Sequence, residues 1–181
     1  PVLAAIALIL LIGGCANRQR ATMLFPDPAL MAAVRLQLNK TEGPVTPEDL
    51  ASMTLLSMGS AYAPGRISDL TGIEACTGLI TIVLVGHKIS DLTPLAKLTG
   101  LTGLNLAANG VADCTPISGL TKLEWLNLSG NALTDVAPLA TLTNLRLLNI
   151  RRNHLTTLAP LGKLTTLEDL TVAHNELTSL A

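Results

Sequence analysis

The chain is built on the pattern L-x-x-L-x-L-x-x-N, and its clearest copy is Leu123-Glu124-Trp125-Leu126-Asn127-Leu128-Ser129-Gly130-Asn131. Within it, Leu126 and Leu128 alternate with Trp125, Asn127 and Ser129, so the two sets are expected on opposite faces of a short strand. A degenerate copy starts at Leu79 and has His87 in place of the last Asn. The pattern returns at a spacing of 22 residues, starting at Leu101, Leu145 and Leu167. A fixed period of this kind predicts stacked copies of one unit.

Each unit is expected to pair a strand with a turn-rich segment. The units begin at Ile67, Ile89, Val111, Leu133, Leu155 and Leu177. Apolar residues recur every three positions ahead of each strand, and a proline column (Pro94, Pro116, Pro138, Pro160) interrupts them. This spacing indicates tight 3₁₀ or extended turns rather than α-helix. The predicted fold is therefore an α/β leucine-rich solenoid, curved because the strand side of each coil is the narrower one, with parallel strands on the concave face and 3₁₀ turns on the convex face.

The strand positions that face outward are the best candidates for binding. Trp125, the only tryptophan, is expected on the concave face beside Leu147. Aromatic and arginine side chains are enriched among binding hot spots, and apolar anchors are usually rimmed by polar groups. The candidate partner-binding residues are Trp125, Leu147, Asn127, Asn149, Arg151 and Arg152. An alternative interpretation is that Trp125 only covers the backbone at Gly103 and Asn105.

Two further columns of polar residues are expected to serve the fold. Amides at the strand ends can satisfy the backbone of the turn and of the neighbouring coil. This structural column is Asn109, Asn131, Asn153 and Asn175. Carboxylates before each proline are expected to accept N–H bonds within the turns. These are Asp91, Asp113 and Asp135.

The segment 24–65 is expected to be a helical cap followed by an irregular first coil, because the apolar end of a solenoid has to be covered. Asp27 and Pro28 are suited to begin a helix. A stripe of Leu30, Val34 and Leu38 then predicts about three helical turns. Thr46-Pro47-Glu48-Asp49 offers a second helix start, with Asp49 at the capping-box position. Four surplus residues at 61–64 are predicted to form a bulging loop.

The N-terminal residues indicate export. Residues 2–12 are apolar without a break. A run this short fits the h-region of a signal peptide and falls short of the roughly 20 residues that span a bilayer. Ile12-Gly13-Gly14-Cys15 resembles the lipobox of bacterial lipoproteins. That resemblance implies that Cys15 is lipidated and becomes the mature N-terminus.

We therefore expect a lipoprotein-type signal peptide with a truncated start at 1–14, a tether at 15–23, and repeats from 66 to 181 with an incomplete last unit. Cleavage after Ala16 and an uncleaved anchor are the alternatives. All three place the repeats outside the cytoplasm, either anchored to the membrane of the bacterial cell envelope or secreted.

The units, as in Ile89 to Asn109, resemble the 22-residue leucine-rich repeats of the internalin family of bacterial surface proteins. The Phe25-Pro26-Asp27 start also resembles the cap of that family. The resemblance covers residues 24–181 and implies the solenoid fold. It indicates function only weakly, because this fold binds many unrelated partners.

The composition and the remaining reactive residues argue against several other functions. With 12 Lys and Arg against 13 Asp and Glu, the chain has no basic footprint for nucleic acid. Cys76 and Cys114 are expected to be small buried residues rather than nucleophiles or a disulfide pair. His154 and His174 have no third ligand for a metal. No phosphate loop or nucleophile elbow is present, so we expect no enzymatic activity, catalytic residue, cofactor or metal.

The sequence thus predicts an exported or envelope-anchored module that binds a protein partner, or alternatively a glycan, on its concave face. The alternatives are a structural surface lipoprotein without a discrete ligand, and the targeting part of a larger protein.

Overall fold

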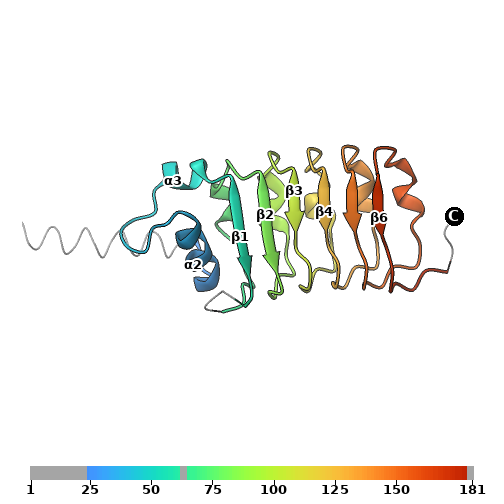
Figure 1. Cartoon of the computed structure of the whole chain (residues 1–181), viewed down its shortest axis with the longest axis horizontal. Coiled ribbons are helices and arrows are strands. Elements are labelled where there is room, and N and C mark those ends of the chain that lie inside the picture. The colour runs from blue at the N-terminus through green and yellow to red at the C-terminus, as the bar shows by residue number, and fades with distance from the viewer. Residues whose placement is uncertain (1–23, 62–64, 179–181) are drawn as a thin grey trace, which may run out of the picture.

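The structure, a computed structural model, describes residues 24–61 and 65–178. Two helices, α2 (Pro28–Gln37) and α3 (Pro47–Ser52), precede a parallel sheet. The strands follow in sequence order as β1 (Leu55–Gly59), β2 (Thr81–Val85), β3 (Gly103–Asn105), β4 (Trp125–Asn127), β5 (Leu147–Asn149) and β6 (Asp169–Thr171). Each strand pairs with the next one, so the sheet forms one side of an open stack of coils (Figure 1).

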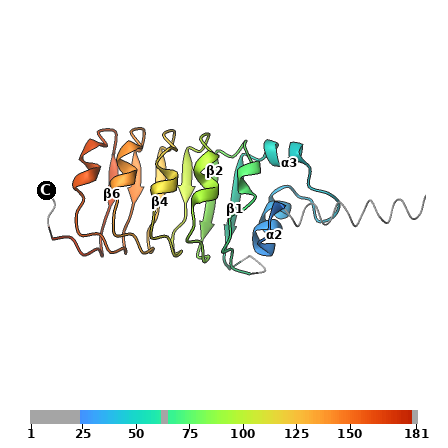
Figure 2. The ribbon, with the colours of Figure 1, turned by 180° about the vertical axis from the view of Figure 1, so that it is seen from behind.

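Short 3₁₀ segments form the opposite side of the stack, as Figure 2 shows from behind. They are η1 (Ile73–Ala75), η2 (Thr93–Lys97), η3 (Thr115–Ile117), η4 (Ala137–Thr141) and η5 (Ala159–Lys163). The prolines of η2 to η5 lie in the first turn, where a missing N–H costs nothing. The predicted fold, a curved solenoid with strands on the concave face and 3₁₀ turns on the convex face, is confirmed.

The core is a continuous stack of aliphatic side chains between the sheet and the 3₁₀ segments. Every apolar position of the fourth unit is at most 2% exposed: Leu133, Val136, Leu139, Leu142, Leu145, Leu148 and Ile150. Because the next coil covers each layer, no large aromatic side chain is needed to fill the space. Fully burying one leucine contributes about 1.5–3 kcal/mol relative to leaving it exposed.

Strand ends are held by the asparagine column. The Asn131 Oδ1 accepts the Val111 N–H at 2.9 Å, and its Nδ2 donates to the carbonyls of Leu106 and Leu128 at 3.0 Å each. One buried amide therefore links its own turn to the preceding coil. In the first unit, His87 replaces the amide: its Nδ1 accepts from Ile67, and its Nε2 lies 3.0 Å from the Met58 carbonyl.

The helical cap is tied to the repeats by one carboxylate. Asp27 caps α2 with its Oδ1, which accepts the N–H groups of Ala29 and Leu30. Its Oδ2 accepts the N–H groups of Ser68 and Asp69, at the start of the first repeat. The sequence predicted the capping role of Asp27 but not this second attachment.

The remaining features of the cap follow local rules. Leu30 and Val34 of α2 are fully buried, whereas Leu38 is half-buried. A capping box between Thr46 and Asp49 begins α3. Cys15, the segments at 1–14 and 15–23, and residues 62–64 of the predicted loop lie outside the described residues.

Candidate functional site

The concave face consists of three columns of side chains that run across the strands. The strand register aligns the first column as Leu55, Thr81, Gly103, Trp125, Leu147 and Asp169. The second column contains Ser57, Val83, Asn105, Asn127, Asn149 and Thr171. The third column lies two residues beyond the second, just after β3, β4 and β5 end, and includes Ala107, Ser129 and Arg151. The alternation of each strand turns these residues away from the core.

Trp125 lies over Gly103 of the neighbouring strand and is half-buried. A Cβ placed on Gly103 would come within 2.2 Å of the indole Cε2 and Cζ2 atoms. Only glycine therefore leaves room for the indole in this position. The backbone-covering interpretation of Trp125 thus describes one face of the ring, and the rest of the ring is available to solvent.

Leu147, beside Trp125 on β5, is 48% exposed. Together the two side chains border a shallow depression of about 220 Å³. Its lining comes from β4, β5 and β6: Trp125, Leu126, Asn127, Leu147, Leu148, Asn149, Asp169 and Thr171. The structure therefore brings together four of the six candidate binding residues, and Asp169 joins them from the last strand.

The two candidate arginines lie beside this depression rather than in it. Arg151 follows β5 in the third column and is half-buried. Arg152 is exposed and sits in the next turn with a left-handed φ of 54°. The equivalent turn position is glycine in two other units, Gly86 and Gly130, which also have positive φ. Within the described part of the chain, neither arginine forms an ion pair.

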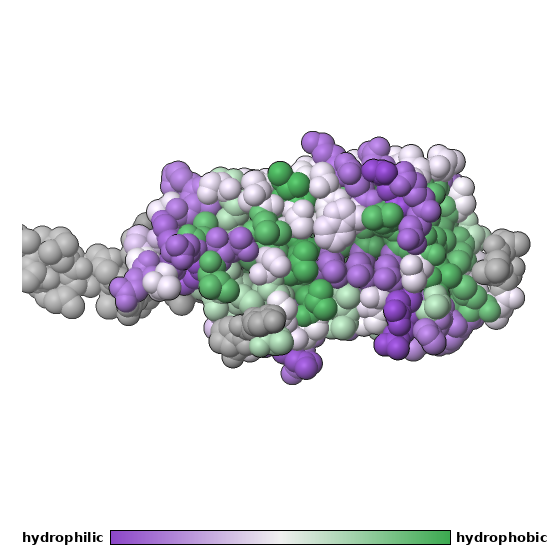
Figure 3. Space-filling view, viewed as in Figure 1, coloured by the Kyte–Doolittle hydropathy of each residue, from purple (hydrophilic) through white to green (hydrophobic). Residues whose placement is uncertain are grey.

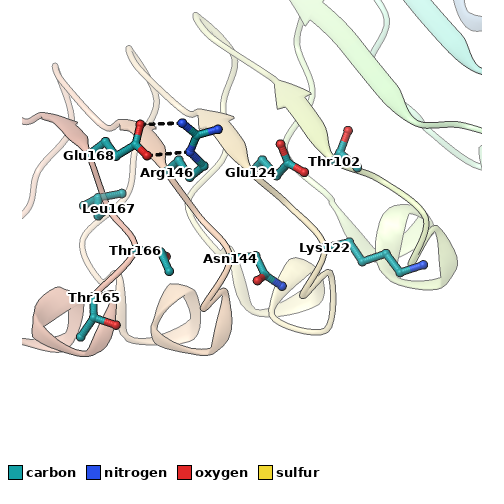
Figure 4. A pocket seen from close by; sticks show the side chains of 9 residues that line it. All are labelled: Thr102, Lys122, Glu124, Asn144, Arg146, Thr165, Thr166, Leu167 and Glu168. Carbon is teal, nitrogen blue, oxygen red and sulfur yellow. Dashed lines mark hydrogen bonds and ion pairs between the residues drawn. The ribbon is translucent and has the colours of Figure 1, made fainter.

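Hydrophilic surface gathers along both edges of the C-terminal half of this face (Figure 3). One edge carries a larger hollow of about 780 Å³ at the amino ends of β4 to β6. Its lining includes Lys122, Glu124, Asn144, Arg146 and Glu168 (Figure 4).

An ion pair fixes one side of this hollow. Arg146 donates from Nε and Nη2 to the two Glu168 carboxylate oxygens at 2.8 and 2.9 Å. The hydrogen bond to Arg146 lowers the pKa of Glu168. The sequence did not predict this hollow, although Glu124, Arg146 and Glu168 recur every 22 positions, one place before each of β4, β5 and β6.

The described residues offer little for catalysis. Burial raises the pKa of Cys76 to about 12, with a smaller contribution from the nearby charge of Glu74. Burial likewise raises the pKa of Cys114 to about 12. Across residues 24–61 and 65–178, no group of His, Cys, Asp and Glu side chains has the arrangement of a metal site. His154 instead pairs with Glu176 at 2.8 Å. In the same part of the chain, no helix is long and apolar enough to cross a membrane.

The repeats define the chain as a leucine-rich-repeat protein. A family model for leucine-rich repeats in two copies matches residues 121–161. Internalin C2 from Listeria monocytogenes is 35% identical, with a TM-score of 0.83 over 88% of this chain and 70% of the other.

Internalin F from the same organism is 32% identical, with the same TM-score over 88% of this chain and 47% of the other. The plant peptide hormone receptor RGFR1 in complex with RGF2 is 26% identical, with a TM-score of 0.55 over 60% of this chain and 19% of the other. No curated protein sequence matches the chain. The chain belongs to the internalin family of bacterial leucine-rich-repeat proteins.

Proposed function

We propose that this chain is a binding module that docks a protein partner on its concave face. The observation that carries the proposal is the pairing of Trp125 with Leu147 at the border of one shallow depression. Leu147 exposes about half of its surface, although apolar side chains of this size are usually buried. A half-buried aromatic side chain beside an exposed aliphatic one, with amides around them, has the composition of an interface centre with a polar rim.

The family supports this assignment. Leucine-rich-repeat domains of internalins and receptors generally mediate protein–protein interaction. The related receptor, whose structure is a complex with RGF2, supports a polypeptide ligand in particular. Arg151 and Arg152 supply cations at the carboxyl ends of the strands, where they would pair with acidic groups of the partner.

The test is binding of affinity-purified partner to the complete protein and to three variants. Trp125→Ala and Arg151→Ala should each weaken binding, the first by about 30-fold, which corresponds to the roughly 2 kcal/mol that defines a hot spot. Lys97→Ala on the convex η2 segment is the matched surface control and should leave affinity unchanged. Unchanged affinity in both concave-face variants, with their folds intact by circular dichroism, would reject the proposal.

We also propose that the module is held at a membrane surface through lipidated Cys15. The support is the segment Ile12-Gly13-Gly14-Cys15 after an apolar run of signal-peptide length. Metabolic labelling with a palmitate analogue should mark the complete protein and not its Cys15→Ser variant. Absence of label in both would argue for a secreted or otherwise anchored form and would leave the binding proposal intact.

A further inference from the structure

Three amides cross the middle of the concave face as a row of oriented donors. The Oδ1 atoms of Asn105, Asn127 and Asn149 accept the backbone N–H two residues ahead, at 3.0, 3.0 and 3.2 Å. Each bond fixes its amide so that Nδ2 is the group left for a ligand. All three residues are half-buried, and no buried polar side-chain atom lacks a partner among the described residues. The three Nδ2 groups must therefore reach solvent.

The indole of Trp125 adds a fourth donor and a flat apolar surface. Nothing in residues 24–61 or 65–178 accepts a hydrogen bond from its Nε1, and that atom is likewise not sealed from solvent. Trp125 lies on β4, between the strands that carry Asn105 and Asn149. This central part of the face thus offers several N–H donors and an aromatic ring, with Asp169 and Arg151 beside it, while its amide oxygens already accept bonds.

A ligand that suits this surface has carbonyl acceptors and few N–H groups of its own. Proline residues have no backbone N–H, and a polyproline II helix has no internal hydrogen bonds, so its carbonyls are free. Aromatic side chains are the usual docking surface for such segments. An amphipathic helix fits less well, because it requires an apolar groove where this face has amides.

The spacing of the donors agrees with the same conformation. Asn105 and Asn149 lie two strands apart, about 9.6 Å at the usual strand separation of about 4.8 Å. One turn of polyproline II takes three residues and advances about 9.3 Å, so carbonyls three residues apart face the same way at nearly this distance. In a β-strand, equivalent carbonyls repeat at about 6.7 Å and match neither one nor two strand spacings.

We propose that the partner element recognised by this face is a proline-rich segment in the polyproline II conformation, lying across β3, β4 and β5. Carbonyls three residues apart accept from Asn105 and Asn149, and a proline ring of the same segment packs on the indole of Trp125, which lies over Gly103 of β3. The proposal rests on the proposed binding function and specifies the chemistry of the partner at the same site.

The test uses Trp125 as the reporter, since it is the only tryptophan in the chain. The complete protein is titrated with capped decaproline and, separately, with a capped glycine–serine peptide of equal length. We expect a saturable change in tryptophan fluorescence with decaproline and none with the glycine–serine peptide. No saturable change with decaproline up to millimolar concentration, or an equal change with both peptides, would overturn the proposal.

Matched variants assign the signal to the donor row. Asn105→Asp and Asn149→Asp keep an oxygen that accepts the backbone N–H and replace the donor by a charged carboxylate oxygen. Each should weaken decaproline binding by about tenfold, the effect of losing one good hydrogen bond. Gln37→Glu makes the same chemical change at an exposed position of α2 and should have no effect. Equal affinity in all four proteins would place decaproline elsewhere and overturn the proposal.

The outcome is separable from that of the proposed function. If Trp125→Ala weakens binding of the purified partner but decaproline gives no signal, the face binds protein by other chemistry and only the polyproline inference fails. If Trp125→Ala and Arg151→Ala both leave partner binding unchanged, the proposed function fails, whatever decaproline does.

Discussion

Replacing Asn131 by alanine should destabilise the solenoid far more than the same change at Asn175. Asn131 is 9% exposed, and the Val111 N–H has its Oδ1 as acceptor inside the stack. The Leu106 and Leu128 carbonyls each receive a second amide, from Asn109 and Asn153, and so keep one donor after the substitution. The change therefore leaves one buried N–H donor without an acceptor and removes one of the two donors from each of two carbonyls.

These losses set the expected magnitude. A buried donor without a partner costs about 1–3 kcal/mol, and each lost second bond costs about 0.5 kcal/mol. Asn131→Ala should therefore lower the free energy of unfolding by about 3 kcal/mol. Asn175 is half-buried and its Oδ1 accepts the Leu155 N–H at 3.1 Å, where water can substitute, so the same change should cost about 1 kcal/mol.

An aspartate at the same position gives a pH-dependent control. Asn131→Asp keeps the acceptor for Val111 but sets a carboxylate oxygen against two carbonyls, which favours the protonated form and raises the pKa in the folded state. The stability of this variant relative to wild type should be highest below the unfolded pKa of about 3.9 and fall as the pH rises through the folded value. Urea unfolding followed by Trp125 fluorescence measures both effects. Equal costs at Asn131 and Asn175, or an Asn131→Asp variant whose stability difference from wild type does not change with pH, would show that the buried Asn131 amide does not stabilise the turn in this way.

Three further predictions concern other parts of the chain. Burial acts to raise the pKa of Asp27, but hydrogen bonds from the backbone N–H groups of four residues outweigh it and the pKa is lowered from 3.8. Its contribution to stability is therefore complete above pH 3.8 and lost as the pH falls through the lowered value. Asp27→Asn should cost about 2 kcal/mol at pH 7 and flatten the acid limb of the stability curve, as urea titrations at several pH values would show. Burial raises the pKa values of Cys76 and Cys114 to about 12, so both thiols should resist iodoacetamide at pH 8 in the native protein and react in denaturant. Mass spectrometry of peptides measures the labelling, and rapid labelling of either cysteine in the native protein would contradict its burial. Arg152→Gly should stabilise the protein by about 1 kcal/mol by relieving the left-handed backbone, and a lower urea midpoint would show that the arginine makes compensating contacts.

The solenoid itself was predictable because its information is repeated. A leucine at one position, such as Leu126, meets its equivalents Leu104 and Leu148 at a fixed spacing, so the period alone defines the strand register. The same register placed Trp125 beside Leu147. The proline column likewise identified the 3₁₀ side of the coils.

Features that depend on the direction of one side chain were not predictable. The second attachment of Asp27, to Ser68 and Asp69, joins residues more than 40 positions apart and has no periodic counterpart. The hollow beside Arg146 and Glu168 depends on rotamers that bring two exposed side chains together. The fixed orientation of the amides in the row depends on bonds such as that from the Ser129 N–H to Asn127, which alternation along a strand does not reveal.

The most direct test of the central claim is site-specific photocrosslinking of the complete protein in the cells that make it. A photoreactive amino acid at Leu147 reports on the concave face, and one at Ala96, exposed on η2, reports on the convex face. We expect a discrete protein adduct from position 147, lost when Trp125→Ala is added, and no such adduct from position 96. An adduct from position 96 alone, or equal adducts from both positions, would contradict binding on the concave face.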